Sequence, residues 1–398
     1  MTTTLNTRLA DDLAALRAAG TYKTLQYLNS PMAAKAEVEN RGETTILCSN
    51  NYIGLADKPE LISAAKAALD KYGAGAASVR FICGTFTIHR QLEEKVAQFL
   101  HTEASLTYAS CWCANTALVP AIIGPGDAVI SDELNHASII DACRMAHKDA
   151  MKMVYKHADM ASLEEKLHLA TAAGCPVKLV ITDGVFSMEG DIALLPQICE
   201  LAQKYQATVM IDESHATGVL GKTGRGTMEY YDMLGRVDII TGTFGKALGG
   251  AGGGFVAGSR DLIDILVQRS RPHLFSNSLP PVLSAIALAA IEYLERHPEI
   301  TDSLRAKTAY MRDALIAKGL KPLKGDSAII PLIVGDTALS ISVAGEMLKQ
   351  GIHAIGFGFP VVPEGTARIR IQVSDALSYQ EIDRAVEIIS NICPVVED

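Results

Sequence analysis

The feature that most constrains the fold is the alternation of short apolar segments with longer segments of helical period. Short segments rich in β-branched residues predict strands at Thr45–Cys48, Ser105–Ala109, Ala128–Ser131, Lys178–Thr182, Thr208–Asp212, Asp238–Thr241 and Gly254–Ala257. Apolar residues three or four apart predict helices at Pro59–Tyr72, His89–Leu100, Ser138–Lys148, Ser162–Ala173 and Leu195–Tyr205. Buried strands that alternate with helices predict an α/β fold, a doubly wound and mostly parallel sheet covered on both faces.

The pattern changes after a long apolar helix predicted at Pro281–Arg296. A smaller α+β unit follows, with strands near Ala328–Val334 and Ala367–Val373 and helices at Thr301–Lys318, Leu339–Gln350 and Gln380–Ile392. At the other end, leucines at helical spacing predict an amphipathic N-terminal helix. We therefore expect an N-terminal helix and arm at 1–55, a large domain at 56–285 and a C-terminal domain at 286–398.

Charge and apolar patterning exclude several classes of protein. Lysine and arginine number 36 and aspartate and glutamate 45, which gives a net charge of −9 without a basic block, so nucleic acid is not expected as a partner. Charged residues interrupt the N-terminal apolar positions, and Glu292 interrupts the longest apolar run, so we expect no signal peptide, no membrane partner and a cytoplasmic location. The scattered cysteines lack a second pair at ligand spacing, and we expect no metal site.

Polar side chains follow four of the predicted strands at the point where each strand ends. The segments are Ser131-Asp132 with Asn135-His136, Asp183 to Ser187, Asp212 to His215, and Thr241 to Lys246. In an open parallel sheet the carboxyl ends of the strands meet at one rim, where ligands bind. The sequence therefore predicts a site that combines lysine, aspartate, histidine and serine side chains.

Lys246 stands in a glycine-rich segment, with Gly242 and Gly245 before it and a glycine cluster at 249–254 after it. Such a backbone can approach a flat ligand closely, and an apolar surrounding favours the neutral amine that a Schiff base requires. Asp212 can keep a pyridine nitrogen protonated, and a lysine paired with an aspartate in this way is typical of pyridoxal phosphate (PLP) sites. Thr243 and the backbone amides that follow Ser110 can bind the phosphate.

Several longer segments resemble the α-oxoamine synthase family of fold-type-I PLP enzymes. They are Thr241–Gly250 (TGTFGKALGG), Asp212–His215 (DESH), Ser131–Ile140 (SDELNHASII), Asn50–Leu55 (NNYIGL) and Gln268–Leu279 (QRSRPHLFSNSL). The resemblance extends from about Leu47 to the C-terminus. Within the family, Ser78–Thr85, Gly235–Thr243 and Arg269–Leu279 are most similar to the glycine C-acetyltransferases. The sequence departs from their pattern at Cys113, where an aspartate is expected, and at Thr116.

The resemblance implies a role for each residue that matches a motif. Lys246 forms the Schiff base and acts as a catalytic base, Asp212 holds the pyridine nitrogen, His215 contacts the phenolic oxygen, and His136 stacks on the ring. The phosphate is bound by the backbone amides of Cys111 and Trp112 and by the hydroxyl of Thr243, and Ser276 and Asn277 reach it from a second subunit. Ser187 lies near the ring. Asn50 and Arg368 bind the carboxylate of the substrate. Arg370 shares a strand face with Arg368, so either arginine could bind that carboxylate.

The implied activity is a Claisen-type condensation in a homodimer with a shared active site. Glycine and acetyl-CoA give 2-amino-3-oxobutanoate and CoA. An alternative within the family joins a longer acyl-CoA to glycine, alanine or serine, with decarboxylation, and the residue at Cys113 favours it. An alternative of a different class is a non-catalytic, nucleotide-binding α/β protein. The glycine cluster near Phe255 does not match G-x-G-x-x-G, however, and Gly221-Lys222-Thr223 lacks the first glycine of a P-loop.

Overall fold

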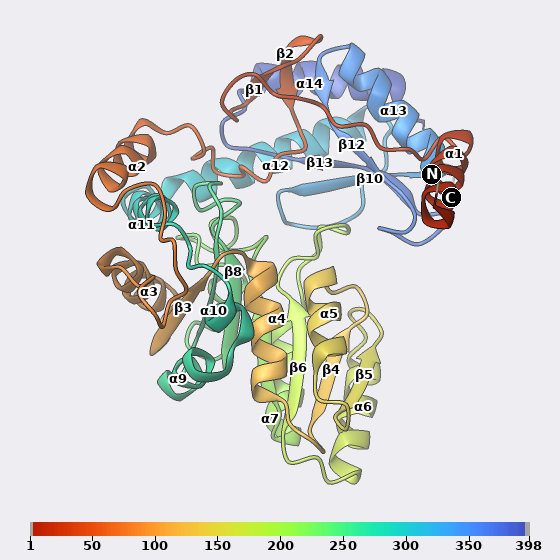
Figure 1. Cartoon of the computed structure of the whole chain (residues 1–398). Coiled ribbons are helices and arrows are strands. Elements are labelled where there is room, and N and C mark those ends of the chain that lie inside the picture. The colour runs from red at the N-terminus through yellow and green to blue at the C-terminus, as the bar shows by residue number, and fades with distance from the viewer. Residues whose placement is uncertain (1–2, 395–398) are drawn as a thin grey trace. The chain divides into compact units, whose positions relative to one another are not determined.

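The predicted alternation of strands and helices is confirmed in a computed structural model, which describes residues 3–394 (Figure 1). A seven-stranded sheet has the order β3-β9-β8-β7-β6-β4-β5. Its strands are β3 (Ala104–Tyr108), β4 (Ala128–Asp132), β5 (Met151–Tyr155), β6 (Lys178–Asp183), β7 (Thr208–Asp212), β8 (Ile239–Thr243) and β9 (Gly254–Gly258). Five neighbouring strands, from β8 to β5, are parallel, which confirms the mostly parallel α/β fold.

Helices connect the strands along the chain, and several of their bounds match the prediction to the residue. The helices are α1 (Thr4–Ala18), α2 (Pro59–Tyr72), α3 (Thr87–Leu100), α4 (Cys111–Ile122), α5 (Ala137–Met145), α6 (Met160–Ala172), α7 (Leu195–Tyr205), α8 (Thr227–Tyr230), α9 (Arg260–Arg269), α10 (Arg271–Phe275), α11 (Pro281–Arg296), α12 (Glu299–Ala317), α13 (Thr337–Lys349) and α14 (Tyr379–Ile392). The seven-stranded sheet has a core on the face covered by α4, α5 and α9. Because parallel crossovers are right-handed, α6 and α7 lie on the opposite face, where they pack against each other.

Two features of the sheet were not predicted. Strand β9 runs antiparallel to β8, because the connection at 244–253 is too short to carry a crossover helix. Strand β5 lies at the edge of the sheet, and its exposed and half-buried residues alternate instead of forming the apolar run of a central strand. The sequence prediction missed β5 because it relied on continuous apolar segments.

A second part of the fold is built from two small sheets. The first contains β1 (Lys35–Val38), β2 (Gly42–Ile46) and β11 (Ile352–His353), and the second contains β10 (Ile329–Gly335), β13 (Ala367–Gln372) and β12 (Ile355–Phe357). The predicted strands near 328–334 and 367–373 correspond to β10 and β13. Helix α1 has no buried residue, and its leucines at 5, 9, 13 and 16 are exposed. Across residues 3–394, we find no helix with the length and apolar character that a bilayer crossing requires.

The chain divides into two compact units at limits other than those of the predicted domains. One unit contains residues 1–49, 188–190 and 306–398, and the other contains residues 50–187 and 191–305. The predicted limit near 285 falls within α11, which packs along its length against α2 and α3 and so belongs with the sheet of seven strands. The domain limits at 55 and 285 stay a prediction.

His157 contacts three side chains at the rim of the large sheet. Its Nδ1 lies 3.1 Å from Asp132 Oδ1, and its Nε2 lies 2.8 Å from Asp191 Oδ2. The ring packs edge-on against Phe186, with 4.4 Å between ring centroids. Burial opposes the charged form, but the two carboxylates prevail and raise the pKa of His157 to about 10. A charged imidazole therefore fixes the base of the turn that contains Ser187.

We expect the variant His157→Gln to lower the free energy of unfolding by about 2 kcal/mol near pH 6. The pKa in the folded protein, about 10, lies above the unfolded value near 6.5. The stabilisation is therefore complete below pH 6.5 and is lost as the pH rises through 10. Urea denaturation of both proteins at several pH values measures the difference. A difference that stays constant up to pH 10 contradicts this account. The exposed His147, replaced in the same way, is the matched control.

Candidate functional site

The carboxyl ends of β6, β7 and β8 bring the predicted polar residues to one rim. In the sheet register Asp183 pairs with Asp212, and Asp212 pairs with Thr241, so these strand ends are immediate neighbours. Helix α4 begins at the same rim, because it follows β3 directly. Gly254 at the start of β9 lies against this helix start, where a β-carbon would overlap backbone atoms of Ser110 and Cys111. The glycine therefore allows β9 and the helix to approach closely.

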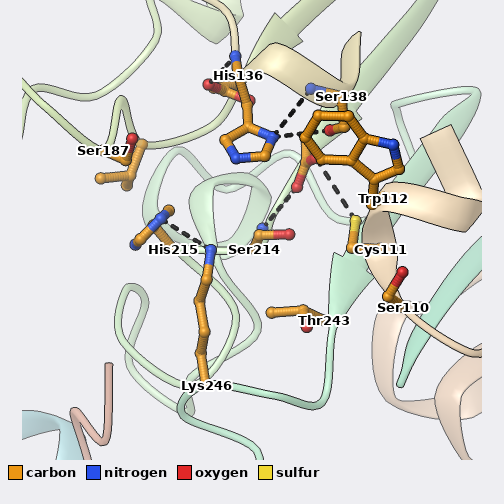
Figure 2. Close-up of a pocket in the computed structure, with 13 residues that line it drawn as sticks. Ser110, Cys111, Trp112, His136, Ser138, Ser187, Ser214, His215, Thr243 and Lys246 are labelled. Carbon is orange, nitrogen blue, oxygen red and sulfur yellow. Dashed lines mark hydrogen bonds between the residues drawn. The ribbon is translucent and has the colours of Figure 1, made fainter. Parts of the chain in front are cut away.

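A cavity of about 190 Å³ opens at this rim (Figure 2). Its lining consists of Ser110, Cys111, Trp112, His136, Ser138, Asp183, Val185, Ser187, Asp212, Ser214, His215, Thr243 and Lys246. Eight residues to which the sequence prediction gave a site role are among them: Cys111, Trp112, His136, Ser187, Asp212, His215, Thr243 and Lys246. The structure thus brings together most of the predicted site from four strand ends and one helix start.

The amine of Lys246 is held at the edge of the cavity by His215. Lys246 Nζ lies 2.8 Å from His215 Nε2, and His215 Nδ1 lies 2.8 Å from the hydroxyl of Tyr52. The rings of Tyr52 and His215 meet edge to face with 6.0 Å between centroids. Tyr52 is completely buried, so it fixes the imidazole, which in turn orients the amine.

Asp212 is a buried carboxylate that remains ionised. Burial alone would raise its pKa, but hydrogen bonds from Ser214 and Asn115 and the nearby charge of Lys246 together hold the pKa below its ordinary value. Asn115 Nδ2 donates to Asp212 Oδ2 over 2.6 Å, and the backbone N–H of Ser214 donates to Oδ1 over 2.9 Å. A fixed negative charge in the wall of the cavity is suited to hold a cationic N–H group of a ligand.

The first turn of α4 offers an anion site beside Thr243. Ser110 caps the helix, and its hydroxyl accepts the N–H of Cys113 over 3.1 Å. The N–H groups of Cys111 and Trp112 precede it, in the turn where an α-helix provides no internal acceptor. These amides and the positive end of the helix favour a phosphate group. The hydroxyl of Thr243 lies in the lining of the same cavity.

His136 stands at the start of α5 and forms part of the opposite wall. Its backbone N–H donates to Asp183 Oδ2 over 2.9 Å. Its ring lies edge to face with that of Trp112, with 5.8 Å between the ring centroids. Burial lowers the pKa of His136, so the imidazole is neutral at physiological pH. A neutral imidazole can stack on a planar ligand without the free-energy cost of removing a charged group from water.

Four predicted site residues lie outside this lining. Asn50 comes just before the buried Asn51 and Tyr52, and Ser276 and Asn277 are exposed residues that follow α10. Asn277 forms an isolated antiparallel bridge with Val79. Arg368 lies on β13, in the unit that also contains residues 188–190. Its Nη1 donates to the backbone oxygen of Met188 and to Glu189 Oε1, each over 3.0 Å.

The sequence prediction gave no site role to Tyr52, Asn115 or Ser138. Each belongs to a segment that the prediction had singled out: Tyr52 to Asn50–Leu55, Ser138 to Ser131–Ile140, and Asn115 to the helix after Ser110. A buried polar residue one helical turn from a site residue is the signal that could have identified Asn115, which lies four positions after Cys111. Their contacts depend on pairings between distant segments, which spacing does not reveal.

The donor set fits a planar, phosphorylated pyridine. An ionised carboxylate, an anion site at a helix start and a lysine amine line one small cavity, with an imidazole in its opposite wall. A family model for aminotransferase class I and II matches residues 43–389. The chain belongs to this family.

Similarity to individual proteins places this family member among the α-oxoamine synthases. The chain is 47% identical over 385 residues to 2-amino-3-ketobutyrate coenzyme A ligase of Escherichia coli, with 97% of this chain and 96% of that protein covered. It is 45% identical over 378 residues to 8-amino-7-oxononanoate synthase of Symbiobacterium thermophilum, with 95% of each chain covered. A solved serine palmitoyltransferase variant from S. paucimobilis, which has a bound PLP–myriocin aldimine, matches with a TM-score of 0.90 and 27% identity over 98% of both chains.

These relationships bear on the alternatives left by the sequence. Membership of this synthase family removes the support for a non-catalytic nucleotide-binding protein. Cys113, which had favoured a longer acyl group, is half-buried and packs against the core between α4 and the sheet. Its side chain is not part of the cavity lining, whereas the neighbouring Trp112 is.

Proposed function

We propose that the protein condenses glycine with acetyl-CoA in a PLP-dependent reaction that gives 2-amino-3-oxobutanoate and CoA. The observation that carries the proposal is the convergence of Lys246, Asp212, His215 and His136 on one cavity at the rim of the sheet. Identity of 47% to a 2-amino-3-ketobutyrate coenzyme A ligase over nearly the whole chain supports this choice of substrates.

The residues that would hold PLP follow from the donor set of the cavity. Asp212 would bind the pyridine nitrogen in its protonated form, and the amides of Cys111 and Trp112 with the Thr243 hydroxyl would bind the phosphate. His215 would contact the phenolic oxygen, with Ser187 near the ring, and His136 would lie on the ring face. Bound PLP supplies an electron-accepting ring that stabilises negative charge on the α-carbon of an amino acid.

The residues of this chain supply the proton transfers. The Lys246 amine can remove the α-proton of glycine when it is neutral, and the contact with His215 fixes the direction from which it does so. The α-carbon then attacks the carbonyl of the acetyl thioester, and the thiolate of CoA leaves. Because the Asp212 carboxylate is fixed in advance by Asn115 and Ser214, it needs no reorganisation during the reaction.

The remaining roles complete the proposal. Arg368 would bind the glycine carboxylate with Asn50, and its guanidinium group would then exchange the contact with Glu189 for one with the substrate. Ser276 and Asn277 are exposed, and in a homodimer they would contact the phosphate of the PLP bound to the second subunit. The exposed leucines of α1 would cover part of that partner. A cytoplasmic location stays a prediction.

The second candidate is a longer acyl-CoA joined to glycine, alanine or serine. Identity of 45% to an 8-amino-7-oxononanoate synthase favours it. The test is release of free CoA by the purified, PLP-loaded protein across a matrix of amino acids and acyl-CoA chain lengths. We expect the highest kcat/KM for glycine with acetyl-CoA. If kcat/KM were highest for a longer acyl chain, or for alanine or serine, the first candidate would be wrong and the second would be supported.

Gly254 provides a test of the phosphate site that does not require turnover. A methyl group at this position would overlap the backbone at the start of α4. We expect Gly254→Ala to weaken PLP binding about tenfold or more, because the amides of Cys111 and Trp112 must move. Equilibrium titration with PLP measures the change. Gly345→Ala is the control, since an added β-carbon there meets open space. Equal PLP affinity in the two variants would contradict this placement of the phosphate.

A further inference from the structure

The wall of the cavity contains a chain of hydrogen bonds that links Asp212 to His136. Asn115 Nδ2 lies 2.6 Å from Asp212 Oδ2 and 2.9 Å from Ser138 Oγ. Ser138 Oγ lies 2.7 Å from His136 Nδ1. Asn115 and Ser138 are 0% and 1% exposed, so water does not compete for these contacts. Figure 2 shows Ser138 beside His136, with the second ring nitrogen of His136 on the side away from Ser138.

The chemistry of these groups determines the direction of each hydrogen bond. An amide nitrogen only donates, so Asn115 gives one hydrogen to the Asp212 carboxylate and the other to the Ser138 oxygen. The Ser138 oxygen can accept a second hydrogen, so its contact with His136 Nδ1 alone does not determine the tautomer. The backbone N–H of Ser138 determines it, because this group donates to Nδ1 over 3.2 Å as part of the N-terminal cap of α5. The hydroxyl hydrogen of Ser138 is then directed at the same nitrogen. A ring nitrogen that receives donors carries no proton.

We propose that Asn115 and Ser138 are positioning residues that hold His136 in one neutral tautomer, with its proton on Nε2 and directed into the cavity. In that tautomer His136 donates a hydrogen bond to an oxygen of the substrate, a carboxylate or a thioester carbonyl. The role toward substrate rests on the proposed function, whereas the tautomer depends only on residues of this chain. Because Asn115 binds Asp212 as well, the same amide orients both the carboxylate and the imidazole.

The direct test is the ¹⁵N spectrum of the imidazole rings in the PLP-loaded protein. The His136 signal is assigned by its loss in His136→Gln. We expect the chemical shifts of an unprotonated Nδ1 and a protonated Nε2. A protonated Nδ1, or rapid exchange between both tautomers, would overturn the proposal. The spectrum is recorded without substrate. It therefore separates this inference from the proposed function, which fails independently if no CoA is released.

Variants test whether the two residues act as a unit. We expect Ser138→Ala and Asn115→Ala each to lower kcat about fivefold or more and to increase the fraction of the other tautomer. Ser138→Ala removes the hydroxyl beside His136 Nδ1, and Asn115→Ala removes the donor to that hydroxyl and to Asp212. The double variant should lose about as much as the larger single change, and Ser138→Thr, which keeps the hydroxyl, should restore the tautomer. If the losses of kcat multiply in the double variant and the ¹⁵N spectrum of His136 is unchanged in both single variants, the two residues do not position His136 as a unit and the proposal is refuted.

The matched control is Ser284→Ala. Ser284 is a completely buried serine in α11, outside the cavity lining, so its replacement removes a hydroxyl without touching the chain of hydrogen bonds. We expect the His136 signal and kcat of this variant to equal those of the wild type. A change in the His136 signal of the control would show that the tautomer responds to any loss of a buried hydroxyl, and the assignment to Ser138 would then be rejected.

Discussion

Replacement of Lys246 by alanine is expected to lower CoA release from glycine and acetyl-CoA by about a thousandfold or more. Positioned general bases contribute about 10²- to 10⁴-fold, and in the proposed function this amine would also provide the covalent attachment of the cofactor. The variant should still bind PLP, because the phosphate site and Asp212 are intact. It should retain no PLP covalently after reduction with borohydride, in contrast to the wild type.

The matched control is Lys222→Ala. Lys222 is also preceded by a glycine, but its side chain is exposed and lies outside the cavity lining. Its replacement should leave both turnover and borohydride labelling unchanged. If Lys246→Ala kept most of the wild-type turnover, the assignment of the base would be wrong. If the label were found on another lysine, the assignment of the attachment site would be wrong.

Replacement of Asp212 by asparagine is the change with the second largest expected effect. We expect kcat to fall about a hundredfold, because the variant lacks the negative charge that would keep the pyridine nitrogen protonated. The pKa of Asp212 lies below its ordinary value despite burial, so the wild-type side chain carries that charge at every pH of a practical assay. Turnover and the absorbance of bound PLP, measured side by side, separate loss of chemistry from loss of cofactor.

Asp183 offers the comparison for this variant. It is the neighbour of Asp212 in the sheet register and is equally buried. Burial and the adjacent charge of Asp212 raise the pKa of Asp183 well above its ordinary value, whereas the pKa of Asp212 is lowered. Because burial favours the protonated form of Asp183, Asp183→Asn should remove less charge than Asp212→Asn and should lower kcat by less than about tenfold. Equal losses in the two variants would contradict this difference between the two carboxyl groups.

The fold was largely predictable because its central strands are buried on both faces. Continuous apolar segments such as Lys178–Thr182 and Thr208–Asp212 identified β6 and β7, and helical periodicity identified α2, α7 and α11 to the residue. Periodicity failed where a strand lies at an edge, as β5 does, and it did not reveal that β9 runs antiparallel. It also could not assign α11 to a unit, since that depends on its packing against α2 and α3.

Part of the site was predictable for a topological reason. The residues that follow parallel strands must meet at one rim, so Asp212 and Lys246 could be expected together. The supporting contacts were not predictable, because each joins segments far apart in the chain. Tyr52 reaches His215 across 163 positions, and Asn115 reaches Asp212 across 97. Spacing shows which chemistry is present, whereas the charge state of Asp212 depends on distant partners such as Asn115.

The most direct test of the central claim follows the nitrogen of glycine. The PLP-loaded protein is incubated with acetyl-CoA and glycine labelled with ¹⁵N and ¹³C, and free CoA and labelled products are quantified together. The proposal predicts one CoA released per glycine consumed, and a product that contains the labelled nitrogen, both labelled carbons and the two carbons of the acetyl group. CoA release that does not require glycine, or transfer of the labelled nitrogen to an acceptor oxo acid without carbon–carbon bond formation, would contradict it.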